Sequence, residues 1–217
     1  LYKDGSAYKD EDGLGYTMTI DSAKNYIIAD KQDGKLLFND GGFLTGIEDT
    51  NGNRQIIAYQ YENNMHRITT VQDPSGRIFT YRYNSAGQLA SITDPAGRAT
   101  TYTYGDGTHL TKITDPDGGA TEITYSGNYP TRISNLADGT KVEFAYDARK
   151  RAFAVASCGT NGQIATKYTL AFKENYTVIT DHTGRKYTYR FNNFGQTISV
   201  VDNQTNQASY YEFGAPS

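Results

Sequence analysis

A pair of apolar, mostly aromatic residues with one residue between its members returns about every 21 positions along this chain. A fixed period of this length constrains the fold strongly, because each period must form one supersecondary unit that stacks on the next. The steps between successive first members are 23, 22, 21, 21, 21, 24 and 21 residues. The pairs are Leu36/Phe38, Tyr59/Tyr61, Tyr81/Tyr83, Tyr102/Tyr104, Ile123/Tyr125, Phe144/Tyr146, Tyr168/Leu170 and Tyr189/Phe191.

Turn sequences of the form Asp-x-x-Gly follow the same period. Aspartate accepts hydrogen bonds from backbone amides ahead of it, proline presets φ at the second position, and glycine tolerates positive φ at the fourth. A second turn follows about ten residues later, so each period predicts one β-hairpin. The turn residues that carry this prediction are Asp73, Pro74 and Gly76, Asp94, Pro95 and Gly97, Asp115, Pro116 and Gly118, and Asp181 and Gly184.

Alternation within the strands indicates a sheet rather than helices. In Thr101–Tyr104 the tyrosines take one face and the threonines the other. We therefore expect an all-β array of about nine antiparallel hairpins that form one twisted, curled sheet or a partial β-shell. Leu89 and Ile92 lie three residues apart, which predicts a β-bulge in the second strand. We expect a half-buried ladder of cross-strand aromatic neighbours, made of Tyr59, Tyr61, Tyr81, Tyr83, Tyr102, Tyr104, Tyr125, Phe144, Tyr146, Tyr168, Tyr189 and Phe191.

Two regions depart from the period. Residues 1–23 predict a lead-in segment that is partly β, and residues 24–217 predict a single repeat array without a second domain. Within the array, residues 149–162 lack the usual turn sequence and predict an irregular connection. The chain starts without Met or a signal-like segment, and we expect it to be a piece of a longer protein.

Composition excludes several classes of function. The net charge is -3 with both signs scattered and no extended Lys/Arg run, so nucleic-acid binding is not expected. No apolar stretch approaches the roughly 20 residues of a membrane span, so membrane insertion is not expected. The chain has one cysteine, which permits no internal disulfide and is compatible with either the cytoplasm or export.

Residues that could carry chemistry are scattered. His66, His109 and His182 fall in different repeats near turns, and Cys158 has no nearby histidine or second cysteine, so no catalytic or metal-binding motif results. We expect no cofactor. Calcium is the open inorganic alternative, through Asp115 and Asp117 or through Asp10, Glu11 and Asp12. Carboxylates are numerous enough to permit a glycosidase pair, but the turn aspartates already have a structural role.

The string Tyr81–Gly97 reads Tyr-x-Tyr-Asn-x-x-Gly-x-Leu-x-x-Ile-x-Asp-Pro-x-Gly, and Tyr102–Gly118 repeats it except in the first turn, where Gly105 and Thr108 replace Asn and Gly. These motifs resemble the YD repeats of the RHS family, found in large wall-associated and polymorphic-toxin proteins of bacteria. The resemblance implies a β-ribbon that spirals into a hollow shell, followed by a variable C-terminal domain that is often a toxin. No residues match the autoproteolytic aspartate segment of that family, and about nine hairpins are few for enclosing a domain.

The resemblance implies a structural module of a secreted or cell-surface protein. Its partners would be the neighbouring repeats and domains of the same longer polypeptide, and it would not be an enzyme. The alternative from a different class is a carbohydrate-binding module, which would stack exposed tyrosines on cell-wall or host glycans. The absence of tryptophan disfavours it, because tryptophan offers the largest stacking surface. A glycan-acting enzyme is the third and most remote alternative.

Overall fold

A computed structural model describes residues 2–4, 7–9, 14–62 and 64–213. All regular elements in this part of the chain are β-strands, which confirms the all-β prediction. The strands are β1 (Tyr2–Asp4), β2 (Ala7–Lys9), β3 (Thr17–Ile20), β4 (Tyr26–Ala29), β5 (Lys35–Phe38), β6 (Leu44–Glu48), β7 (Arg54–Glu62), β8 (Met65–Gln72), β9 (Ile78–Tyr83), β10 (Leu89–Thr93), β11 (Ala99–Tyr104), β12 (Leu110–Thr114), β13 (Ala120–Ser126), β14 (Tyr129–Asn135), β15 (Lys141–Tyr146), β16 (Ala152–Cys158), β17 (Ile164–Phe172), β18 (Tyr176–Thr180), β19 (Lys186–Phe191), β20 (Thr197–Asp202) and β21 (Ala208–Tyr210).

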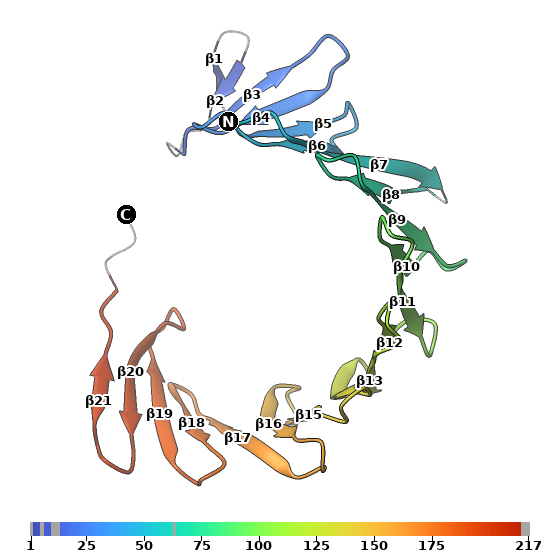
Figure 1. Cartoon of the computed structure of the whole chain (residues 1–217). Helices are drawn as coiled ribbons and strands as arrows, with labels where there is room; N and C mark the ends of the chain where they lie inside the picture. Colours follow the sequence, from blue (N-terminus) through green and yellow to red (C-terminus); the bar gives the residue numbers. More distant parts are fainter. Residues whose placement is uncertain (1, 5–6, 10–13, 63, 214–217) are drawn as a thin grey trace. The chain divides into compact units, whose positions relative to one another are not determined.

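The chain forms two compact units, Leu1–Thr101 and Tyr102–Ser217, with the boundary inside β11. In the first unit each strand pairs antiparallel with the strand that follows it, from β1 to the start of β11. In the second unit β12 to β21 pair in the same way. Figure 1 shows this succession of neighbouring strands within each unit. Both units are therefore arrays of antiparallel hairpins.

The predicted turn chemistry is confirmed at Asp94. Its carboxylate Oδ1 accepts hydrogen bonds from the amides of Ala96 and Arg98, each at 2.9 Å. The amide of Gly97 donates to the carbonyl of Asp94 at 2.9 Å, and Gly97 has a φ of 82°. An L-residue with a Cβ is disfavoured at such a φ, which explains glycine at the fourth position. Asp73/Gly76, Asp181/Gly184 and the backbone of Asp115/Gly118 follow the same geometry.

The irregular connection expected over residues 149–162 is replaced by regular structure. Strand β16 occupies half of this region and pairs with both β15 and β17. A turn at Asp147 precedes it, and Lys150 takes the fourth position with a φ of 64°. The prediction of an irregular connection was wrong because it recognised turns only by a glycine at the fourth position, which here is Lys150. A left-handed conformation costs a residue with a side chain about 1–2 kcal/mol, and the surrounding strand pairing can offset that cost.

Six hairpins carry a bulge in their second strand, which confirms the prediction made from Leu89 and Ile92. In the β9–β10 pair the register shifts between Leu89 and Ser91. Equivalent shifts occur in the pairs β5–β6, β7–β8, β13–β14, β15–β16 and β19–β20. A bulge places one extra residue in one strand and leaves the ladder locally unpaired. The second strands therefore cannot follow a strict period of two.

Each unit is a single layer without a conventional core. Every strand contacts only the strands adjacent to it in the chain. No large side chain among the described residues is fully buried, and the only buried hydrophobic residues there are Ala120 and Cys158. The accessible surface is 14609 Å², whereas a compact monomer of this mass, 24.0 kDa, would expose about 9,900 Å². Stability must therefore come from repeat-to-repeat contacts along the sheet.

Candidate functional site

A hydrogen bond from a tyrosine hydroxyl to the preceding strand recurs along the sheet. For Tyr59, Tyr83 and Tyr146 the acceptor is the carbonyl of the residue just before the extra residue of the second strand. We call this arrangement the tyrosine latch. The bonds run from Tyr59 to Leu44 at 2.9 Å, from Tyr83 to Ile68 at 3.0 Å, from Tyr125 to Leu110 at 2.9 Å and from Tyr146 to Pro130 at 2.9 Å.

The bulge explains why this carbonyl needs a side-chain donor. In β8 the extra residue is Thr69, because Ala58 pairs with Thr70 and Tyr59 pairs with Ile68. The carbonyl of Ile68 lies where the regular ladder is interrupted, and Tyr83 of the next hairpin donates to it. A half-buried carbonyl without a donor costs free energy, so the latch both satisfies the bulge and joins consecutive hairpins.

Threonine completes the bulge in three hairpins, and Thr111 of β12 makes the same contact. In each case the threonine hydroxyl donates across the hairpin to a carbonyl of the first strand. These bonds join Thr45 to Leu37 at 3.2 Å, Thr69 to Ala58 at 3.3 Å, Thr111 to Thr103 at 3.2 Å and Thr131 to Thr124 at 3.2 Å. The bulges at Thr45, Thr69 and Thr131 are thus held from both sides, by their own threonine and by the tyrosine of the following hairpin.

A flat side chain covers the ring of each latch tyrosine. It belongs to the residue just before the latch carbonyl, so that one short segment supplies both the acceptor and the cover. Such contacts stabilise by about 0.5–1.5 kcal/mol for aromatic pairs and about 0.5–1 kcal/mol for exposed cation–π pairs. The ring centres are 5.6 Å apart for Phe43 and Tyr59, 4.7 Å for His109 and Tyr125, and 5.2 Å for Tyr129 and Tyr146. The guanidinium carbon of Arg67 lies 5.6 Å from the centre of the Tyr83 ring.

Burial raises the pKa of the Tyr59 hydroxyl. It is also the largest cause of the raised pKa of the Tyr83 hydroxyl. A raised pKa keeps both groups protonated, which is the state that can donate a hydrogen bond. The electrostatics of the latch therefore favour a structural donor rather than a reactive phenolate.

The expected ladder of ring against ring is replaced by alternation of rings and aliphatic side chains. Tyr81 pairs with Ile92, Phe144 with Val155, and Tyr189 with Val200. Each repeat contributes two strands, so successive first strands are separated by a second strand and lie about 9.5 Å apart. The ladder prediction was wrong in this respect because it placed the first strands side by side.

Two of the predicted pairs are shifted by two residues. The register makes Ile57/Tyr59 equivalent to Tyr81/Tyr83, since it is Tyr59 that forms the latch. It likewise places Phe172 rather than Leu170 at the latch position of β17, because Ala154 pairs with Thr169. Both β7 and β17 are nine residues long, which hides the shift in the sequence. Their remaining tyrosines are exposed, Tyr61 by 62% and Tyr168 by 45%.

The latch changes in the later repeats of the second unit. Phe172 and Phe191 occupy the latch positions of β17 and β19, and phenylalanine has no hydroxyl to donate. Arg151 still covers Phe172, with its guanidinium carbon 4.2 Å from the ring centre. Tyr104 stands at the latch position of β11, 21 residues after Tyr83, and Tyr102 precedes it on the same face of the strand.

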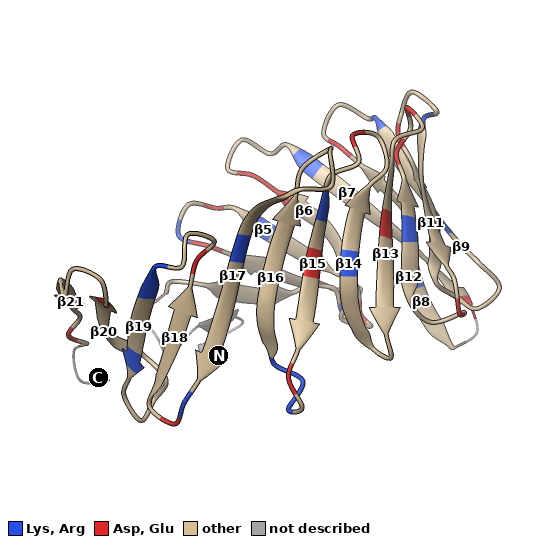
Figure 2. Ribbon diagram, turned by 90° about the horizontal axis from the view of Figure 1, so that it is seen from below, with Lys and Arg blue, Asp and Glu red and all other residues tan. Residues whose placement is uncertain are grey.

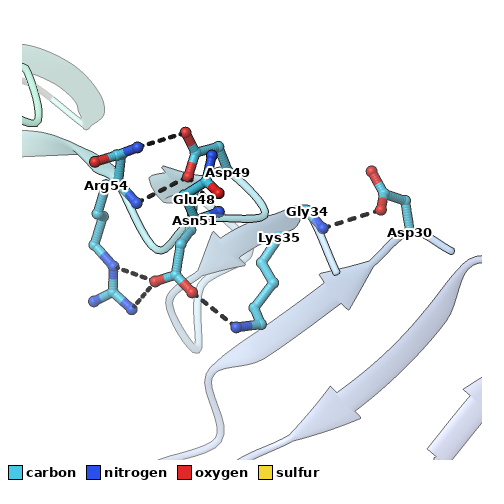
Figure 3. A network of polar contacts seen from close by, with 8 residues as sticks. Asp30, Gly34, Lys35, Glu48, Asp49, Asn51 and Arg54 are labelled. Atoms are coloured by element: carbon cyan, nitrogen blue, oxygen red, sulfur yellow. Dashed lines mark hydrogen bonds and ion pairs between the residues drawn. The ribbon is translucent and has the colours of Figure 1, made fainter. Parts of the chain in front are cut away.

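A network of charged groups ties β5, β6 and β7 together in the first unit (Figure 3). Glu48 accepts from Lys35 at 2.7 Å and from Arg54 at 2.8 Å. The hydrogen bond from Lys35 is the main cause that lowers the pKa of the Glu48 carboxyl, followed by that from Arg54. The carboxylate is thus fully used in bridging neighbouring strands, which is a structural role.

The histidines and the cysteine lie apart in the structure as in the sequence. His66 stacks on Phe43 at 4.0 Å and on Tyr61 at 4.8 Å. The Nδ1 of His109 lies 2.5 Å from an Asp106 carboxylate oxygen, while His182 is in an exposed turn and Cys158 is buried.

The calcium candidates have backbone contacts of their own. Asp117 accepts from the amide of Gly119 at 3.2 Å, and the Asp115 carbonyl accepts from Gly118 at 3.0 Å. The second candidate group, residues 10–12, lies outside the described residues. In the part of the chain that the structure describes, no three His, Cys, Asp or Glu residues are grouped as metal ligands. The same part contains no helix long and apolar enough to cross a membrane.

Sequence reasoning missed the covering residues and the bulge threonines. A signal for them is present, because a flat residue, an aliphatic residue or proline, and a threonine occur together 15 or 16 residues before each observed latch tyrosine. These tripeptides are Phe43-Leu44-Thr45, Arg67-Ile68-Thr69, His109-Leu110-Thr111 and Tyr129-Pro130-Thr131.

Comparison with known proteins places repeats of one family in this chain. The family model described as RHS Repeat matches residues 38–78 and 83–120. No curated protein sequence matches the chain.

Solved structures that resemble the chain do so distantly. One of the Photorhabdus luminescens Tc holotoxin pore shares 13% identity over 89% of this chain and 15% of that chain, with a TM-score of 0.36. One of TcdB2-TccC3-Cdc42 shares 13% identity over 94% of this chain and 15% of that chain, with a TM-score of 0.41. A porin-like protein from Bacteroides uniformis shares 13% identity over 92% of this chain and 82% of that chain, with a TM-score of 0.33.

The chain spans only 15% of the length of those two toxin structures. TM-scores below 0.5 are too low for any of these likenesses to carry functional meaning. The family match, in contrast, covers the segments that contain the latches of Tyr59 and Tyr83 and the turns of Asp73, Asp94 and Asp115. Residues 38–78 and 83–120 match the RHS Repeat family model, in agreement with the resemblance seen in the tyrosine pairs and Asp-x-x-Gly turns.

Proposed function

We propose that this chain is a structural repeat module of a larger exported or cell-surface RHS protein. It would build part of a β-shell or stalk that carries or encloses another domain of the same polypeptide. The tyrosine latch is the observation that carries this proposal. Its tyrosine, carbonyl, bulge and covering side chain all serve to join one hairpin to the next, so these prominent polar groups have structural partners within the array.

The single-layer architecture supports the same function. A sheet that exposes both faces has little stability to spare for a strained catalytic site. It can instead be extended by further hairpins, because each added unit bonds only to its neighbour. In the proposed context the repeats on either side would pair with the terminal strands, which otherwise present unpaired backbone groups. A catalytic role is not part of the proposal.

Exposed aromatic rings favour a carbohydrate-binding module as the second candidate. Tyr61 is 62% exposed, Tyr168 is 45% exposed and Tyr210 is 79% exposed. Such rings can stack on the flat face of a sugar. They lie on β7, β17 and β21, and the last two belong to the second unit.

Binding of the purified chain to a glycan array and to isolated bacterial cell walls separates the two candidates. A structural module is expected to bind no glycan saturably while it retains a cooperative thermal melt. Saturable binding that is lost in Tyr61→Ala, Tyr168→Ala or Tyr210→Ala would overturn the structural proposal in favour of adhesion. Tyr81→Phe serves as the matched control, because Tyr81 is half-buried and paired with Ile92.

A further inference from the structure

Four cations gather at the tips of two neighbouring hairpins of the second unit. We propose that this group, the basic tip, binds a phosphate group carried by a soluble ester or a lipid headgroup. Three of the cations lie in the turn between β15 and β16, and the fourth lies in the turn between β17 and β18. The basic tip consists of Arg149, Lys150, Arg151 and Lys173.

The two turns enclose an open cavity. Its lining consists of Arg149, Arg151, Phe172, Lys173 and Glu174. Three of the four cations thus line one space, although 22 residues separate the Arg151 and Lys173 positions, while Lys150 lies beside it in the same turn. Figure 2 shows the basic residues in the turn that joins β15 to β16. Elsewhere cations pair with carboxylates, along the strands as Arg132 and Glu143 do at 3.0 Å, or within a turn as Arg98 and Asp94 do at 2.6 Å.

Local contacts hold one cation and leave two others for a ligand. Arg151 donates to Asp147 at 2.8 Å and lies over the Phe172 ring at 4.2 Å, so its position is fixed. Hydrogen bonds from the Arg151 backbone and side chain also lower the pKa of the Asp147 carboxyl, which keeps this pair ionised. Arg149 and Lys173 are exposed, and neither forms an ion pair with another residue that the structure describes.

Lys150 provides a separate indication that positive charge is useful at this tip. It has a φ of 64°, in the fourth turn position that Gly76, Gly97 and Gly184 occupy elsewhere. A lysine there is less favourable than glycine, and residues kept in such conformations are often found at functional sites. Its ammonium lies 5.4 Å from the centre of the Tyr129 ring.

Phosphate suits this arrangement better than a carboxylate or a sugar. Guanidinium groups donate in a fork that matches two phosphate oxygens, and ammonium groups add point charges without a fixed geometry. Four cations against the carboxylates of Asp147 and Glu174 leave the tip positive, whereas the whole chain carries a net charge of -3. A shallow site of this kind binds one exposed oxyanion at the end of a larger molecule.

Lys24 offers an internal control. It also stands at the fourth position of an Asp-x-x-x turn, with a φ of 65°, but its turn, Asp21-Ser22-Ala23-Lys24, contains no other cation. Lys24→Gly and Lys150→Gly therefore relieve the same backbone strain, while only Lys150→Gly removes charge from the basic tip.

The test is a titration of the isotope-labelled chain with inorganic phosphate, followed by amide NMR at constant ionic strength. Saturable shifts confined to residues 147–151 and 172–174 are expected. Arg149→Ala and Lys173→Ala should each weaken binding about tenfold, the usual consequence of losing one charge-assisted contact. Lys150→Gly should weaken binding, whereas Lys24→Gly should not. Thermal melts of all variants check that the fold is retained.

Two further titrations distinguish the sources of the phosphate group. Binding of glycerol phosphate with the same variant pattern would support a soluble ester, and binding of vesicles that contain phosphatidylglycerol, but not of phosphatidylcholine vesicles, would support a lipid headgroup. Absence of saturable shifts with inorganic phosphate would overturn the proposal. Equal binding by wild type, Arg149→Ala and Lys173→Ala would do the same.

Discussion

Removal of one latch hydroxyl is expected to destabilise the chain more than removal of a neighbouring hydroxyl. Tyr83→Phe deletes the 3.0 Å hydrogen bond to the carbonyl of Ile68 and keeps the ring beneath Arg67. An average hydrogen bond contributes about 0.5–1.5 kcal/mol, and a carbonyl left without its donor adds part of a desolvation cost of about 1–3 kcal/mol. Because this carbonyl is only partly shielded in a single-layer sheet, we expect a loss of about 1–1.5 kcal/mol.

Tyr81→Phe is the matched control for this substitution. Tyr81 lies two residues away on the same strand, is also half-buried, and its hydroxyl makes no hydrogen bond with another described residue. Its loss should change the free energy of unfolding by less than about 0.5 kcal/mol. Urea denaturation at pH 7 measures both values. The latch account is refuted if the two variants lose the same stability, or if Tyr83→Phe is indistinguishable from wild type.

The protonation state of the latch gives a second readout on the same pair. Burial raises the pKa of Tyr83 in the folded state, so its contribution is fully present below the unfolded value of about 10 and is lost as the pH rises through the folded value. Wild type should therefore lose stability above about pH 10. Tyr83→Phe should lose less over the same range, as measured by urea denaturation at pH 8 and pH 11.

Other changes should act in directions that the structure sets. Phe172→Tyr restores a hydroxyl at a latch position and should raise the unfolding free energy by about 0.5–1 kcal/mol in urea; no gain would show that β17 has lost the acceptor geometry. Gly97→Ala should cost about 1–2 kcal/mol, because a Cβ there contacts nothing but the φ of 82° is unfavourable for alanine. Lys150→Gly should stabilise by up to about 1 kcal/mol, because it removes a side chain from a left-handed conformation. A stabilising Gly97→Ala or a destabilising Lys150→Gly in thermal melts would contradict this. Hydrogen bonds from Arg98 lower the pKa of Asp94, so the stability that this carboxylate contributes should be present above about pH 4 and be lost as the pH falls further. Asp94→Asn should therefore lose less stability than wild type between pH 5 and pH 2. An equal loss in both would count against the turn account.

Sequence reasoning captured the elements of this fold that local chemistry determines. The Asp94–Gly97 turn could be predicted because aspartate and glycine satisfy its geometry without help from distant residues. The bulge at Leu89 could be predicted because it disturbs a period of two. These features depend on residues fewer than ten positions apart.

Features that depend on strand register were predicted less well. Tyr59 and Tyr61 are indistinguishable in the sequence, and only the pairing of β6 with β7 decides which of them reaches the Leu44 carbonyl. The turn at Lys150 was missed because pairing of β15 with β16 stabilises a conformation that lysine alone disfavours. The covering role of Arg67 likewise appears only once β8 and β9 are aligned.

The central claim is that each unit is an array of hairpins bonded in series, without a common core among its described residues. Residue-resolved hydrogen exchange of wild type and Tyr125→Phe tests it most directly. The account predicts faster exchange in β12, β13 and their immediate neighbours, with unchanged protection in β18–β20, because each hairpin contacts only the next. A uniform loss of protection across the second unit would contradict the account, since it would mean that the unit unfolds as one cooperative body.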